Sequence, residues 1–298
     1  MTDQVRVLHA GVLTDLVGRG LAPALLKKHD LEVDAVGGHS VGLAMRILDG
    51  SLEGDVYLSA DARTNALLSG ASGRHLVSWF LVFARNSIVI AYSRSGPLAG
   101  AFDRVSRGEA PWYEVMGRPG VRLARNDPNL DPLGYYTLLV CSLAEEHYNL
   151  AGFRRALLGD DVNPEQVGRA GFAGLADGSI DAMFLYRSAA IGRDFGVIEL
   201  PDEINLGSTE LATSYMRARY TTTDGYEVRG APISHGGAVL ASARNPRAAL
   251  TFMEVLASPA GQGKVKESHF LPSPILAGGS AELLPQGLAR LVEGRYLA

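Results

Sequence analysis

Short apolar runs alternate with amphipathic stretches along much of the chain. The runs predict strands, and they lie at residues 5–10, 33–36, 55–58 and 120–124. Helical patterns follow them, at residues 15–28 and 41–48, from residues 59–61 onward, and from the turn at residues 127–132 to near Tyr148. Strands that alternate with helices predict an α/β protein whose helices pack on largely parallel sheets.

One segment departs from this alternation. Residues 81–92 form a long β-prone run whose single charge is Arg85. A strand of this kind is typical of a passage from one lobe to another. Residues 197–233 are also rich in strand and loop, and helix returns from Pro246. We therefore expect two crossings, which give a discontinuous lobe 1 (residues 1–83 and 200–298) and a lobe 2 (residues 84–199).

Length, composition and charge agree with such a two-lobed protein. The chain has 298 residues, of which 47% are hydrophobic, and a formal net charge of -4. This is enough apolar material for two cores, and it excludes disorder as the main state. The chain has 28 basic and 32 acidic residues. It therefore lacks the excess of basic residues that is typical of nucleic-acid-binding proteins, and we expect no nucleic-acid partner.

Cys141 is the single cysteine, so disulfide frameworks and cysteine-based zinc sites are excluded. It lies in an apolar run, which favours a buried, inert thiol. No stretch reaches the roughly 18 apolar residues of a membrane span. The first residues lack the pattern of a signal peptide. Two interpretations stay open: a cytoplasmic protein, or the mature form of an exported one.

Small hydroxyl residues stand where predicted strands lead into helices. Ser40 precedes the helix at residues 41–48, and Ser59 precedes the next one. Ligands of open α/β sheets bind at such corners, where helix N-termini attract anions. Each serine either caps its helix or donates its hydroxyl to a ligand, and the glycines at 37 and 38 favour close approach of a ligand.

A third corner lies at residues 127–132, which contain two Asp-Pro steps. Pro132 suits the first position of a helix, so Asp131 is expected to be its N-cap. Tyr135 follows in the first turn and brings a phenol to the same place. This turn is either a binding element or a rigid, well-capped connection.

Other chemistries lack their motifs. Phosphate-binding glycine loops, nucleophile elbows and paired metal-binding histidines do not occur. No nucleophile–base pair accompanies the corners, so we expect no enzyme, no cofactor and no metal. Arg85, Arg125 and Arg187 lie near predicted strand ends, where they pair with carboxylates or with an anion.

Several segments, taken together and in order, resemble one known family. They are HAGVL (residues 9–13), DVYLSAD (55–61), FARNSIVIAY (83–92), WYEV (112–115), DPNLDPLGY (127–135), GSIDAMFLYRSA (178–189) and ELPDEINL (199–206). This set is similar to the archaeal-type molybdate/tungstate-binding proteins of ABC importers, over residues 5–275.

The resemblance implies a two-lobed type II periplasmic-binding-protein fold, with two mixed sheets flanked by helices and a hinge. It implies a tetrahedral oxyanion clamped between the lobes, a membrane permease as partner, and an exported, periplasmic or membrane-tethered location. We also expect a monomer. The ligand-binding positions that it implies are Ala10, Gly11, Val12, Ser40, Ser59, Asp131, Tyr135 and Arg187.

Two family ligand groups are missing. Val12 stands where the family has a serine, and Gly168 stands near the position of a family glutamate, with Glu165 the nearest carboxylate and Arg169 beside it. Loss of the glutamate favours plain anion recognition by hydrogen bonds and positive charge. Sulfate, phosphate or a small organic anion therefore competes with molybdate and tungstate. An anion sensor or storage module, and less favourably an enzyme, are the alternative functions.

Overall fold

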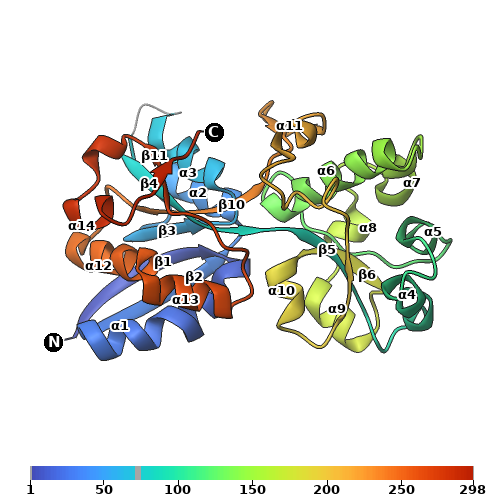
Figure 1. Cartoon of the computed structure of the whole chain (residues 1–298), viewed down its shortest axis with the longest axis horizontal. Coiled ribbons are helices and arrows are strands. Elements are labelled where there is room, and N and C mark those ends of the chain that lie inside the picture. Colours follow the sequence, from blue (N-terminus) through green and yellow to red (C-terminus); the bar gives the residue numbers. More distant parts are fainter. Residues whose placement is uncertain (1, 71–74, 298) are drawn as a thin grey trace. The chain divides into compact units, whose positions relative to one another are not determined.

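The computed structural model describes residues 2–70 and 75–297. It divides into two compact units. Unit 1 consists of Met1–Arg85 and Ile233–Ala298, and unit 2 consists of Asn86–Pro232. The chain therefore passes between the units twice, and unit 1 is built from both ends of the chain (Figure 1).

Unit 1 is built on a seven-stranded mixed sheet with the order β12-β11-β4-β10-β3-β1-β2. Its strands are β1 (Asp3–Ala10), β2 (Leu31–Gly38), β3 (Val56–Ser59), β4 (Trp79–Asn86), β10 (Ile233–Val239), β11 (Leu276–Gly279) and β12 (Gly294–Arg295). Its helices are η1 (Gly11–Leu13), η2 (Leu16–Leu21), α1 (Ala22–His29), α2 (Ser40–Leu48), α3 (Ala62–Gly70), α12 (Pro246–Ala257), α13 (Pro259–Glu267), η3 (Ala281–Leu283) and α14 (Gln286–Ala289).

Helices cover both faces of this sheet. On one face, Leu43 and Ile47 of α2 and Leu68 of α3 join a cluster with Leu8 and Tyr57 of the sheet. On the other, Met253 of α12 lies close to Gly237 of β10. Strands covered on both faces need apolar residues throughout, and every residue of β3 is buried.

Unit 2 has a three-stranded antiparallel sheet, β6-β5-β7, and a separate hairpin of β8 and β9. Its strands are β5 (Ile88–Tyr92), β6 (Ala182–Tyr186), β7 (Gly196–Glu199), β8 (Arg219–Thr221) and β9 (Glu227–Arg229). Its helices are α4 (Ala99–Ser106), α5 (Trp112–Met116), α6 (Pro132–His147), α7 (Phe153–Leu158), α8 (Pro164–Val167), α9 (Gly171–Asp177), α10 (Arg187–Ile191) and α11 (Ala212–Tyr215).

The predicted α/β class is confirmed, and two local predictions differ from the structure. Residues 15–28 are not one regular helix, because the π-helix η2 precedes α1. Pro23 lies in the first turn of α1 and has no N–H to donate to the preceding turn. Residues 120–124 form a single bridge, Leu123 to Ala182, instead of a strand. The Asp181 carboxylate accepts a hydrogen bond from the N–H of Arg122 at 2.8 Å. This side-chain bond takes the place of a main-chain bond between strands, so the strand pairing does not continue.

The second crossing lies later in the chain than residue 200. Residues 201–232 remain with unit 2 because their polar groups are paired there. The Tyr220 hydroxyl donates to Asn129 Oδ1 at 2.9 Å, and Thr223 N donates to the same oxygen at 2.9 Å. The N–H of Ile88 donates to the Asn205 carbonyl at 2.8 Å. Side-chain contacts between distant segments therefore set this boundary.

Gly134 of α6 provides a test of close packing in unit 2. A Cβ at this position would lie 2.6 Å from the carbonyl carbon of Asp127 and 2.7 Å from the carbonyl oxygen of Asn126. We expect Gly134→Ala to lower the free energy of unfolding by about 1–3 kcal/mol, as overpacking does, measured by urea denaturation. Gly100→Ala in α4 is the control, since nothing lies within 4 Å of its added Cβ. Equal effects of the two changes would contradict the packing argument.

Candidate functional site

The carboxyl ends of three neighbouring strands meet at one edge of the unit 1 sheet. β1 is parallel to both β2 and β3, with Ala10 paired to Gly38 and His9 paired to Leu58. The first loop, Ser40 and Ser59 therefore share this edge, which we call the carboxyl edge. Ligands of α/β sheets bind outside such an edge.

Ser40 ties two of these corners together. Its Oγ accepts a hydrogen bond from the N–H of Ala60 at 2.9 Å, and its carbonyl accepts one from the Tyr57 hydroxyl at 2.7 Å. Ser40 is the first residue of α2 rather than its cap, because the N-cap is His39 and no side-chain bond caps the helix. The first intrahelical bond runs from Leu43 N to the His39 carbonyl. The N–H groups ahead of that bond point out of the helix end. Together with the O–H of Ser40, which is itself buried, they are the candidate donors at the carboxyl edge.

The Ser59 hydroxyl has a different role from that of Ser40. It is fully buried and donates to the Asp61 carbonyl at 2.7 Å, with Asn65 Oδ1 as a second close partner. Its proton is therefore used within the protein, where it fixes the turn between β3 and α3. Asn65 was not predicted from the sequence. Its polar side chain, six residues beyond Ser59, is the signal that could have identified it.

The first loop brings main-chain groups to the same edge. Ala10 ends β1 and is buried, while Gly11 is exposed and has open space around its Cα. Val12 lies in the short helix η1 and is partly exposed. With Val12 in place of a serine, this loop offers peptide N–H groups and no hydroxyl.

The glycines of the second corner are required by packing within the protein. A Cβ on Gly37 would lie 3.2 Å from the ring of His9, and one on Gly38 would lie 2.9 Å from the Leu43 side chain. Their small size therefore seats β2 against β1 and α2. This differs from the expectation that they admit a ligand.

The carboxyl edge holds little net charge. The guanidinium of Arg63 makes a two-point pair with the buried Asp61 carboxylate, with Nη2 to Oδ2 at 2.7 Å. Burial lowers the pKa of His9, and it lowers the pKa of His235 on the neighbouring strand to about 4. Both imidazoles are therefore neutral at pH 7.

In unit 2, the turn before α6 is built as the sequence predicts. Asp131 is the N-cap, and its Oδ1 accepts the N–H of Leu133 at 2.8 Å. Asp127 Oδ1 accepts the N–H of Asn129 at 2.8 Å, which fixes the first Asp-Pro step. Tyr135 is buried in the first turn and makes an edge contact with Tyr136. These contacts account for a rigid turn, and they leave its binding role a prediction.

The three candidate arginines are engaged within the protein. Arg187 starts α10 and pairs with Glu199, Nε to Oε1 at 2.7 Å. Arg125 is buried and donates to the carbonyls of Asp160 and Asp161 at 2.6 Å each. Arg85 donates to the Pro272 carbonyl at 2.9 Å. Their charges therefore stabilise loops and one ion pair.

The positions where the family glutamate was expected lie at the end of α8 in unit 2. Gly168 is the C-cap residue of this helix, and Glu165 in its first turn is exposed. Arg169 Nη1 donates to the Leu123 carbonyl at 3.2 Å. This arginine thus holds the segment around residue 123 in place.

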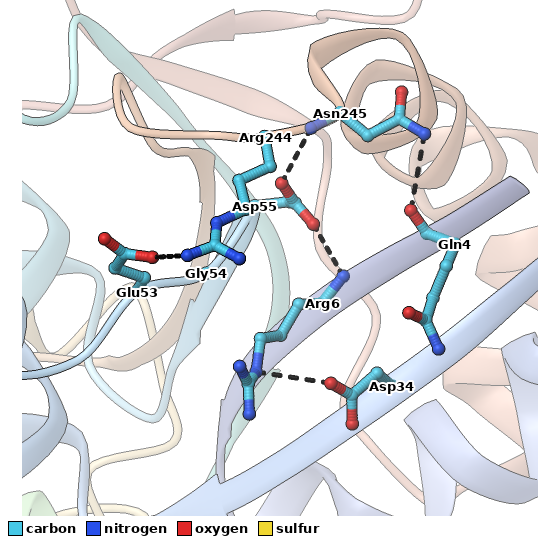
Figure 2. Close-up of a pocket in the computed structure, with 8 residues that line it drawn as sticks. All are labelled: Gln4, Arg6, Asp34, Glu53, Gly54, Asp55, Arg244 and Asn245. Carbon is cyan, nitrogen blue, oxygen red and sulfur yellow. Dashed lines mark hydrogen bonds and ion pairs between the residues drawn. The ribbon is translucent and has the colours of Figure 1, made fainter.

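A cavity of about 190 Å³ lies in unit 1 toward the amino ends of the strands, away from the carboxyl edge (Figure 2). Its charged side chains are paired with one another: Arg6 with Asp34 at 3.2 Å, and Arg244 with Glu53. Asp55 accepts the N–H groups of Arg6 and Asn245 at 2.7 and 3.0 Å. This network joins β1, β3 and the start of α12, so we assign it a structural role.

Among residues 2–70 and 75–297, no cluster of three or more His, Cys, Asp or Glu side chains is arranged to hold a metal ion. Cys141 is buried, and desolvation raises the pKa of its thiol to about 12. The predicted inert thiol is thus confirmed. In the described part of the chain, no helix has the length and apolar character needed to cross a membrane.

The fold is that of solute-binding proteins. The periplasmic molybdate-binding protein of Azotobacter vinelandii superposes with a TM-score of 0.64 and 18% identity, covering 90% of this chain and 99% of that one. The family model described as "Bacterial extracellular solute-binding protein" matches residues 5–271, and the chain belongs to this family.

Relatives agree with this assignment. A Haloferax volcanii protein, named as a candidate ABC transporter molybdenum-binding protein, is 37% identical over 69% of this chain, and the match spans 63% of that protein's length. The molybdate/tungstate-binding protein WtpA of Thermococcus kodakarensis is 28% identical over 87% of this chain and 77% of its own length. The family resemblance inferred from the motifs is thereby confirmed.

The buried His235 predicts how unit 1 responds to acid. Its pKa falls from 6.5 in the unfolded chain to about 4 in the folded one, so the unfolded chain binds the proton more readily. The contribution of His235 to the free energy of unfolding is complete above pH 6.5 and is lost as the pH falls toward 4. We expect a loss of about 2 kcal/mol from this group between about pH 7 and about pH 5, measured by urea denaturation.

His235→Gln is the comparison variant, because its amide does not titrate. The variant should be less stable than the parent at neutral pH and should show a shallower dependence on pH. A pH dependence identical to that of the parent would show that another group titrates.

Proposed function

We propose that this solute-binding protein is the component of an ABC importer that binds a small tetrahedral oxyanion. The observation that carries the proposal is the donor set at the carboxyl edge, which Ser40 organises by its bond from Ala60 N. The names of the molybdate- and tungstate-binding relatives support the choice of ligand class.

Recognition at this edge depends on neutral donors. The N-terminus of α2 carries a partial positive charge, which attracts an anion without a cationic side chain. Arg63 is neutralised by Asp61, and both nearby histidines are uncharged at pH 7. Such a site favours an oxyanion that needs donors on all sides, such as molybdate, tungstate or sulfate.

The other positions that the sequence indicated are also proposed as ligand groups, with less structural support than Ser40. Main-chain N–H groups of the Ala10–Gly11–Val12 loop are proposed donors from unit 1. Asp131, Tyr135 and Arg187 of unit 2 already have partners within the protein. For them, a role in holding the local structure precedes any role toward the ligand.

Transport without catalysis is part of the same proposal. The family consists of extracellular solute-binding proteins, so we propose an exported protein that delivers its ligand to a membrane permease and acts as a monomer. We propose that it turns over no phosphate or acyl ester. Sustained hydrolysis that disappears in a Ser40→Ala variant would overturn this interpretation.

The two corner serines allow a matched test. Calorimetric titration with molybdate, tungstate, sulfate and phosphate should show binding of at least one of them to the unmodified protein. A hydrogen bond to a charged group contributes about 1.5–3 kcal/mol, so we expect Ser40→Ala to weaken that binding roughly tenfold or more. Ser59→Ala is the control, because the Ser59 hydroxyl already donates to Asp61.

Thermal melts separate binding from folding. Both variants lose a buried hydrogen bond, so both should melt at lower temperature. Equal affinity in the parent and in Ser40→Ala would limit Ser40 to its structural bond with Ala60 N. Absence of binding to all four oxyanions would redirect the search to other small anions.

A further inference from the structure

The lysines of this chain are gathered in one place. Of its 28 basic residues, four are lysines: Lys27, Lys28, Lys264 and Lys266. The first two lie in the last turn of α1, and the others lie in the last turn of α13. Two helices that are far apart in the sequence thus carry every lysine of the protein, and Lys27, Lys28 and Lys264 line one groove.

A groove of about 650 Å³ lies between these helices. We call it the lysine groove; its lining includes Arg19, Leu21, Lys27, Lys28, Val255 and Lys264. α1 and α13 lie next to each other in unit 1 (Figure 1), and Gly20 of η2 comes close to Lys264 of α13. The groove therefore belongs wholly to unit 1.

The lining combines apolar surface with an excess of positive charge, because Arg19, Lys27, Lys28 and Lys264 outnumber Glu254, the single carboxylate in that lining. Leu21 is buried and Val255 is half-buried, whereas Lys27 and Lys28 are exposed. Lys264 pairs with Glu267 at 2.7 Å, and Arg19 has a loose pair with Asp15 at 3.6 Å. For Lys27 and Lys28, no ion pair or side-chain hydrogen bond occurs with any described residue.

Helix dipoles explain part of this arrangement. Cations stabilise the C-terminal turn of a helix, which accounts for lysines at the end of α1 and of α13. That explanation applies to each helix separately. It does not account for an apolar groove between the two ends, or for exposed lysines along it.

We propose that the lysine groove is a docking surface for an acidic, amphipathic segment of a partner protein. An amphipathic helix can lay its apolar face into a groove while its acidic side chains meet the lysines at the border. A helix with side chains is about 10–12 Å across, so it enters a concave surface that a flat lipid bilayer touches only at the rim. Each lysine carries its charge on a flexible stem, which can follow the carboxylates of a bound helix.

The test uses a fluorescein-labelled peptide of Glu and Leu at helical spacing, with a peptide of Lys and Leu as its counterpart. Fluorescence anisotropy should show that the protein binds the acidic peptide and not the basic one, and that added salt weakens binding. The triple variant Lys27→Gln, Lys28→Gln, Lys264→Gln should bind roughly tenfold more weakly or worse. The corresponding triple Lys→Arg variant keeps the charge and should bind like the parent.

The matched control is Arg118→Gln, Arg247→Gln, Arg290→Gln, which removes the same charge from exposed sites outside the groove. This variant should retain the affinity of the parent. Equal weakening by both triple neutralisations would reduce the effect to net charge and overturn the proposal, as would absence of binding to the acidic peptide.

Vesicles test the alternative partner. Sedimentation with phosphatidylglycerol–phosphatidylcholine vesicles should not depend on the three lysines. Lysine-dependent sedimentation without peptide binding would assign the groove to anionic membranes and overturn the proposal. Because the lysines lie outside the carboxyl edge, oxyanion affinity should be the same in all of these variants.

Discussion

The hydrogen bond from Ala60 N to Ser40 Oγ is the contact on which the proposed site depends. Parallel pairing of β1 with β2 and β3 brings three strand ends to one edge, but it does not fix how the loops beyond them lie. The Ser40 side chain links two of those loops, and the hydroxyl of the buried Tyr57 donates a hydrogen bond to the Ser40 carbonyl. The direction of the first turn of α2 follows from these two bonds.

The charged groups of the candidate site are also engaged in contacts within the protein. Arg63, Arg125 and Arg187 each pair with a carboxylate or with main-chain carbonyls of the protein. Arginine suits such structural roles because its planar group satisfies several acceptors at once. Under the proposed function, unit 1 would therefore attract an anion through peptide N–H groups and the Ser40 hydroxyl. Selectivity then rests on the arrangement of donors rather than on the sum of charges.

Much of the fold could be predicted from the sequence, because it follows local patterns. The apolar runs predicted β1 and β3, and Asp131 with Pro132 predicted the residue at which α6 begins. Long-range features could not be predicted in this way. The second crossing depends on Tyr220 meeting Asn129, which are distant in the sequence. The different roles of Ser40 and Ser59 also required the structure, since both occupy the same kind of strand-to-helix corner.

A crystal structure of the protein with tungstate tests the central claim most directly, because tungsten is located by its anomalous scattering without assumptions about the site. The account predicts one tungsten atom at the carboxyl edge of unit 1, with oxygens about 3 Å from Ser40 Oγ and from the first N–H groups of α2. Tungstate bound elsewhere, with Ser40 Oγ making no contact to it, would contradict the account.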